Sequence, residues 1–389
     1  MSALAAASFQ GGAGGAGGAG GAGGAGGAGG AGGAGGAGGA VSGSLGDAFA
    51  NPIMMDALLR SRDATVDVHD TQRSATVQPA VDAAASMLRW EPWVRAHVAL
   101  HELLSPLVFQ PVPVAAVASG LKLWWGVAAA AVAAGDPPGA VAWHPVVEIT
   151  RPPTSTFEAQ TGLVLDWAEL REERLTEILA QIDPQYAFWA SVLGMRADRH
   201  RHTMELINVA LQLSVYVEMR FKHALGCWRP CDLSAQVQPL ITTPGHGSLP
   251  SGHATQAYVV AEVLRALRGW GVLHPRDEQL QRQAARIATN RVVAGVHFPV
   301  DSLAGRLLGQ TLGEYFVARC RADGPVWKPR RFDGAAVPPQ EDLEPAAQSL
   351  GDGRSATATP YYVVGQPFGV PPPNALLRGV WDRAAGEWS

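Results

Sequence analysis

Between residues 222 and 301, several side chains that can carry charge lie in or beside segments whose apolar residues recur at helical spacing. Polar groups packed among apolar helices need partners, so the fold must bring such side chains together. A single oxyanion, tetrahedral or trigonal-bipyramidal, could partner three cations at once. The pattern therefore predicts a phosphate or vanadate site, and its charged or titratable members are Lys222, Arg229, His253, Arg291, His297 and Asp301.

The same periodicity predicts the fold class. A long helix is expected from about Asp198 to Leu225, and further helices from Ala254 to Leu267, Asp277 to Ala294 and Pro299 to Cys320. No alternating run of useful length indicates a strand, and residues 81–134 are also predicted to be largely helical. The predicted fold is therefore an all-α helical bundle.

Composition divides the chain into four predicted parts. Residues 1–44 contain an unbroken Gly-Gly-Ala tract from Gly11 to Ala40, which cannot build an apolar core and is predicted to be a disordered lead-in. Residues 45–195 are predicted to form an N-terminal helical region, and residues 196–322 the helical core that carries the motifs. Residues 323–389, rich in Pro and Gly, form a predicted tail.

Charge and cysteine content exclude some classes of function. A net charge of -4 over 389 residues gives no basic field for nucleic acid. Three cysteines are too few for a disulfide framework and favour a reducing compartment. Neither a signal peptide nor a membrane-spanning run is recognised. The sequence thus predicts a soluble, cytoplasmic protein and leaves its oligomeric state open.

The first two motifs supply donors for an anion. Lys222 offers a point charge, and Arg229 in Arg229–Pro230 offers a planar fork that can bind two oxygens. Ser251 and Gly252 precede a predicted helix, where a hydroxyl, backbone amides and the helix dipole favour an anion. His253 is then placed to exchange a proton with the bound anion. The alternatives are ordinary surface cations and a plain helix cap.

The third motif contains Arg291, His297 and Asp301. A His–Asp pair four residues apart shares a helix face, so the carboxylate can hold one ring nitrogen and leave the other free. The free nitrogen could attack phosphorus or bind vanadium. Alone, such a pair is more often a structural hydrogen bond. The order and spacing of the three motifs favour the functional interpretation.

Lys-x6-Arg-Pro, Pro-Ser-Gly-His and Arg-x5-His-x3-Asp together resemble the signature of the superfamily of type 2 phosphatidic acid phosphatases, bacterial nonspecific acid phosphatases and vanadium-dependent haloperoxidases. The resemblance spans residues 222–301 and implies an all-α bundle of the acid phosphatase/vanadium haloperoxidase type. It also implies that His297 is the nucleophile or the vanadium ligand, oriented by Asp301, with His253 as the acid–base partner. Asn290, directly before the arginine of the third motif, stands where the family often has serine. The implied binders of the anion's oxygens are Lys222, Arg229, Ser251, Gly252 and Arg291.

Three functions remain open at this stage. Gly252–His253–Ala254–Thr255 resembles haloperoxidases, and His246 stands where bromide-type haloperoxidases carry a second active-site histidine, although it could equally be a loop histidine. Met219, where those enzymes often have Trp, departs from that branch. The favoured prediction is a haloperoxidase that uses vanadate, hydrogen peroxide and a halide. The alternatives are an acid phosphatase without a cofactor, acting on phosphomonoesters through a phosphohistidine, and a non-catalytic phosphate-binding protein.

Overall fold

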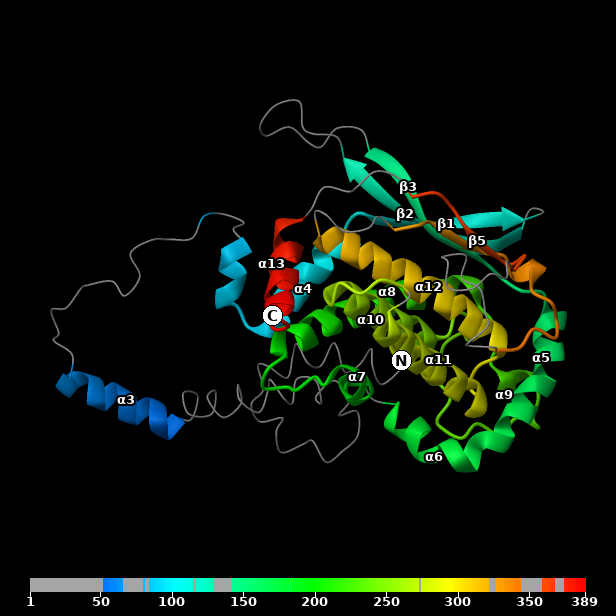
Figure 1. Ribbon diagram of the computed structural model, residues 1–389, viewed down its shortest axis with the longest axis horizontal. Coiled ribbons are helices and arrows are strands. Elements are labelled where there is room, and N and C mark those ends of the chain that lie inside the picture. Colours follow the sequence, from blue (N-terminus) through cyan, green and yellow to red (C-terminus); the bar gives the residue numbers. More distant parts are fainter. Residues whose placement is uncertain are drawn as a thin grey trace.

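The computed structural model describes residues 52–65, 80, 84–114, 117–128, 141–182, 184–272, 274–321, 327–343, 359–367 and 374–389 (Figure 1). The predicted disordered tract from Gly11 to Ala40 lies outside these residues. The N-terminal elements are α3 (Pro52–Thr65), a 3-10 turn (Ala84–Arg89), α4 (Pro92–Leu104) and the strands β1 (Leu107–Val114), β2 (Val117–Ala128) and β3 (Val141–Thr150). They are followed by α5 (Thr154–Trp167), a 3-10 turn (Ala168–Leu170), α6 (Arg171–Ala180) and α7 (Tyr186–Leu193).

The helices that carry the motifs form the centre of the molecule. They are α8 (Arg201–Leu225), α9 (Pro230–Leu233), α10 (Gly252–Leu267), α11 (Pro275–Val293) and α12 (Pro299–Cys320). Four of them match the helices predicted from apolar spacing, and this part of the prediction is confirmed. Their ends follow local chemistry: α8 ends at Gly226 with φ +56°, which glycine adopts without strain, and α12 begins with Pro299 at its first position.

Helices α10 and α12 pack with their backbones unusually close. Three glycines at four-residue spacing lie along α12: Gly305, Gly309 and Gly313. A Cβ atom at Gly305 would lie 2.7 Å from the Ser251 carbonyl oxygen, and one at Gly309 would overlap the Thr255 carbonyl oxygen. Because the N-termini of α10 and α12 carry the second and third motifs, this seam sets the separation of the two motifs.

Replacing Gly309 with alanine should therefore destabilise the protein. We expect the free energy of unfolding to fall by about 1–3 kcal/mol, the usual cost of overpacking, although alanine is the better helix former by about 1 kcal/mol. The measurement is chemical denaturation. Gly162→Ala is the matched control, because a Cβ atom at that position in α5 meets nothing within 4 Å. Equal stability of the two variants would contradict the close packing of this seam.

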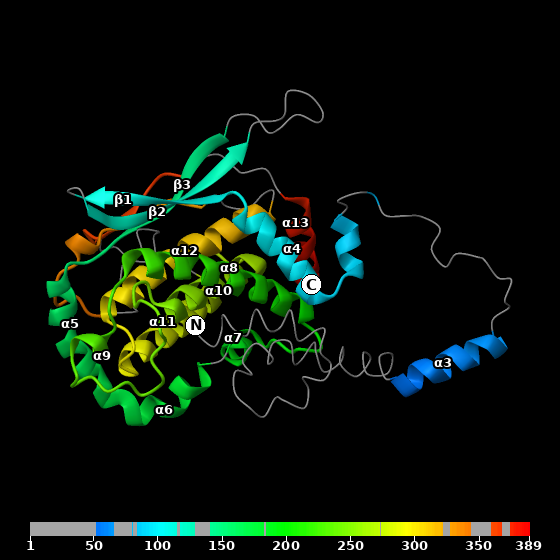
Figure 2. The same ribbon diagram turned by 180° about the vertical axis from the view of Figure 1, so that it is seen from behind.

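The predicted all-α fold class is wrong. A five-stranded sheet lies along one side of the helical body, in the order β1-β2-β3-β4-β5 (Figure 2). Strands β1 to β3 form an antiparallel meander, β4 (Arg330–Phe332) joins β3 in parallel, and β5 (Tyr362–Val364) pairs antiparallel with β4. Strand β2 contacts α8, while β3 and β4 contact α12.

The error has a physical explanation. In β2, Leu121, Leu123 and Trp125 alternate with Lys122 and Trp124 and bury one face of the sheet. This period of two was present in the sequence but was obscured by the adjoining alanines. Prolines in β1 also discouraged a strand assignment, yet β1 is an edge strand, where proline needs no ladder partner. Strands β4 and β5 have three residues each, too few to show a pattern.

The C-terminal residues return to the helical body. A 3-10 turn (Gly334–Ala336) follows β4, and α13 (Ala375–Gly386) packs against α8, α4 and α12 with Trp381 buried. Figure 1 shows α13 and α4 at one end of the body and α5, α6 and α9 at the other. Within the described ranges, no helix combines the length and apolar composition needed to cross a membrane.

Candidate anion site

The third motif forms an oriented histidine at the start of α12. Asp301 is fully buried, and its Oδ2 accepts hydrogen bonds from His297 Nδ1 at 3.0 Å and from the Phe298 amide at 2.9 Å. Since a carboxylate only accepts, Nδ1 of His297 carries the proton and Nε2 keeps its lone pair. Burial, followed by the charges of Arg229 and Lys222, holds the pKa of His297 well below its ordinary value. The pair therefore presents a neutral imidazole whose Nε2 lone pair points away from Asp301 and can accept a hydrogen bond.

Arg229 links this histidine to His246. Its Nη1 donates to His297 Nε2 at 3.1 Å and to the Val296 carbonyl at 2.7 Å. Its Nη2 lies 3.1 Å from His246 Nδ1. His246 Nε2 is buried and has no hydrogen-bond partner among the described residues. The structure thus places His246 beside the motif residues, and burial with the charge of Lys222 lowers its pKa to about 4.

Lys222 holds the loop that leads into the second motif. Its Nζ, at the end of α8, donates to the carbonyls of Gly247 at 3.2 Å, Ser248 at 3.0 Å and Pro250 at 2.5 Å. The side chain is almost fully buried, and burial together with Arg229 lowers its pKa to about 7. All three donors of the ammonium are therefore used by the loop, and an anion would reach Lys222 only by replacing a carbonyl.

Arg291, in the last turn of α11, keeps donors for an anion. Its Nη2 donates to the Ile178 carbonyl at 3.2 Å and to Gln181 Oε1 at 3.0 Å. Its Nε and Nη1 are buried and have no hydrogen-bond partner within the described structure. A buried guanidinium without partners on two nitrogens is costly, and an oxyanion could accept from both.

The N-terminus of α10 completes the site. Ser251 caps the helix through its Oγ, which accepts from the Ala254 amide at 3.5 Å, and its own amide donates to the Asp301 carbonyl at 2.8 Å. A Cβ atom on Gly252 would lie 2.7 Å from Glu218 Oε1, so glycine permits this close approach. His253 Nε2 donates to the Gln181 carbonyl at 2.9 Å, and burial with the charge of Arg291 lowers its pKa to about 3.

Sequence reasoning missed two residues of this network. Glu218 lies one turn before Lys222 on α8, and burial raises its pKa to about 7. A carboxylate on the apolar face of a predicted helix is a signal that could have found it. Gln181 contacts both Arg291 and His253 but is far from the motifs in the sequence. No local pattern marks it.

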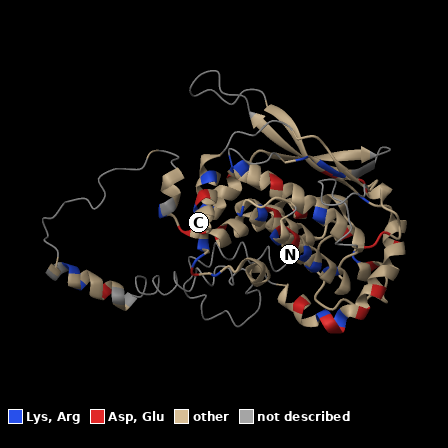
Figure 3. Cartoon of the chain, viewed as in Figure 1, with Lys and Arg blue, Asp and Glu red and all other residues tan. Residues whose placement is uncertain are grey.

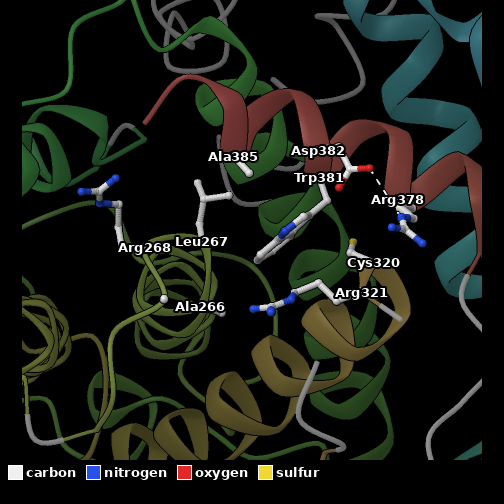
Figure 4. Close-up of a pocket in the computed structure, with 10 residues that line it drawn as sticks. Ala266, Leu267, Arg268, Cys320, Arg321, Arg378, Trp381, Asp382 and Ala385 are labelled. Carbon is white, nitrogen blue, oxygen red and sulfur yellow. Dashed lines mark ion pairs between the residues drawn. The ribbon is translucent and has the colours of Figure 1, made fainter. Parts of the chain in front are cut away.

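A separate cavity lies away from the motifs. It measures about 430 Å³ and opens where the C-terminal ends of α10 and α12 meet α13 (Figure 4). Arg268, Arg321 and Trp381 are among the residues that line it, and none of the motif residues does. The candidate anion site is the cluster around Arg229, near the other end of α10.

Comparisons with known proteins find similarity in the segment that carries the motifs. Residues 205–322 match the family model of the PAP2 superfamily and contain all three motifs. A vanadium-dependent bromoperoxidase of Ascophyllum nodosum is 31% identical to this chain over a match that covers 18% of the chain. The matched part is 17% of the length of that bromoperoxidase, so the resemblance concerns a segment of each protein. Residues 205–322, which carry the three motifs, are therefore similar to the PAP2 superfamily.

Proposed function

We propose that this protein is a haloperoxidase-type enzyme that binds vanadate and uses hydrogen peroxide to oxidise a halide. The observation that carries the proposal is the position of His246. Its Nδ1 lies 3.1 Å from Nη2 of Arg229. Nη1 of the same guanidinium lies 3.1 Å from His297 Nε2. A second imidazole beside the anion site is what the haloperoxidase resemblance requires. The similarity to a vanadium-dependent bromoperoxidase supports the same branch.

The donor set fits vanadate. Buried nitrogens without partners among the described residues occur on Arg291 and His246, and a vanadate oxygen can accept from each. His297 Nε2 would hold the metal atom, and Arg229, Arg291 and the α10 N-terminus would hold its oxygens. Bound vanadate would supply the activation of peroxide towards halide. The same donors also fit phosphate, because the two oxyanions share a geometry.

The side chains of the site would then balance charge and hold or transfer protons. Arg229 and Arg291, both buried, would balance the negative charge of the oxyanion. Asp301 keeps the proton of His297 on Nδ1, so that Nε2 stays available. His253 donates Nε2–H to the Gln181 carbonyl, which leaves Nδ1 as its proton-accepting nitrogen. An anion nearby would raise the pKa of His253 from its low value and allow it to take up a proton.

A paired assay tests the proposal. One portion of metal-free enzyme receives orthovanadate, peroxide and bromide. A second portion receives p-nitrophenyl phosphate alone. We expect bromination that depends on vanadate and that is lost in His297→Ala. The competing phosphatase would use the same atoms: His297 Nε2 attacks phosphorus, His253 protonates the leaving oxygen, and water then releases phosphate. Phosphatase turnover that vanadate only inhibits, with no halogenation at any pH, would overturn the proposal.

A further inference from the structure

The anion site includes a residue from outside the segment that matches the superfamily. Gln181 directly follows α6 and is fully buried, although the matched segment begins at residue 205. Its side-chain Oε1 accepts from Arg291 Nη2 and from Asn290 Nδ2, each at 3.0 Å. Its backbone carbonyl accepts from His253 Nε2 at 2.9 Å. One residue of the N-terminal region therefore contacts two of the predicted site residues.

These contacts decide which atoms are left for the anion. Gln181 and the Ile178 carbonyl occupy Nη2 of Arg291, so that Nε and Nη1 are the nitrogens without partners in the described structure. The carbonyl of Gln181 can only accept, so the proton of neutral His253 is fixed on Nε2. The orientation of a cation and the tautomer of a histidine thus depend on the same residue.

Gln181 is itself held firmly. Its Nε2 donates to Glu177 Oε1 at 3.1 Å, and Glu177 forms a two-point ion pair with Arg286 of α11 at 2.9 and 3.0 Å. Arg174 donates to Asn290 Oδ1 at 3.2 Å. Charged residues of α6, the helix with red and blue segments at the lower right of Figure 3, thus fasten this helix to α11. Asn290, which stands where the superfamily often has serine, binds Gln181 and Arg174.

We propose that Gln181 is a positioning residue of the anion site, aligning Arg291 for the oxyanion and fixing the tautomer of His253, with Asn290 as its anchor. The identity of the oxyanion rests on the proposed function, whereas the two alignments do not. The residue acts through Arg291 and His253 and need not touch the anion itself.

The test compares Gln181→Met with the wild-type protein. Methionine keeps the length of the side chain but removes the acceptor for Arg291 and Asn290. We expect the affinities for orthovanadate and for phosphate, measured by calorimetry, to fall at least tenfold, as for a lost hydrogen bond to a charged group. Gln310→Met is the matched control, because Gln310 is also buried and accepts a hydrogen bond, from Tyr362 at 3.1 Å, in the second half of α12. Its affinities should change less than twofold.

The tautomer of His253 gives a readout that does not need an anion. Nitrogen-15 spectra, assigned with a His253→Gln variant, should show a single Nε2–H tautomer in the wild-type protein and also in Gln181→Met, because methionine keeps the backbone carbonyl that accepts from His253. Unchanged affinity of Gln181→Met for the two oxyanions would overturn the proposal. Tighter binding would also overturn it, because it would mean that Gln181 competes with the anion. If the wild-type protein binds neither oxyanion, the proposed function fails, and the tautomer alone decides: an Nδ1–H tautomer or a mixture in the wild-type protein would then overturn the positioning role.

Discussion

Replacing Asp301 with alanine should lower the free energy of unfolding by about 3–5 kcal/mol, the cost of leaving buried charges without their partner. Asp301 is fully buried, and its carboxylate accepts from His297, Phe298 and Ser248. It also lies near the charges of Lys222 and Arg229. Burial raises its pKa to about 6, so chemical denaturation at pH 8 measures the ionised form.

The control for this experiment is Asp382→Ala. Asp382 also pairs with a cation, Arg378 at 3.5 Å, but 62% of its side chain is exposed. An exposed pair of this kind contributes about 0–1 kcal/mol. If Asp301→Ala cost no more than Asp382→Ala, Asp301 would not be compensating the buried charges, and the electrostatic account of the site would be wrong.

The second large effect concerns Arg229. Its replacement by alanine should weaken the binding of orthovanadate or phosphate by about 2–3 kcal/mol, or about 30- to 150-fold, because a charged fork is lost from a buried site. Arg229→Lys keeps the charge but lacks the planar guanidinium. Its affinity for the anion should lie between those of the wild-type protein and Arg229→Ala. Calorimetric titration of each variant measures the change.

Arg282→Ala serves as the control for charge alone. Arg282 lies on α11, as Arg291 does, but 72% of its side chain is exposed. Its removal should leave the affinity within twofold of the wild-type value. Unchanged orthovanadate binding by Arg229→Ala would refute the placement of this guanidinium in the anion site.

The sequence was most informative where chemistry is local. Helices α8, α10, α11 and α12 were predicted from apolar spacing, and the His297–Asp301 pair from a spacing of four residues on one helix face. Such features depend on neighbours in the chain, which a sequence displays directly. The anion-binding roles of the motif residues remain predictions, although the structure brings His297, Arg229 and His246 into contact.

What the sequence could not supply was contact between distant segments. Lys222 was expected to face an anion, but its three donors bind a loop some 25 residues later, and no spacing rule predicts that choice. Gln181 reaches Arg291 across 110 residues. The sheet was missed for a related reason, because β4 becomes a strand only by pairing with β3, and β5 only by pairing with β4.

The pairing of β3 with β4 also bears on how the chain is made. The Thr150 hydroxyl bonds to the Phe332 carbonyl 182 residues later, and every motif residue lies between the two strands. During synthesis β4 leaves the ribosome after all of α8 to α12, so the sheet can close only once the helices that carry the motifs have been made. Until then β3 has an open edge that could pair with other chains. A chain that stopped before residue 327 would keep every motif residue and would keep that edge open, so its yield would be limited by aggregation.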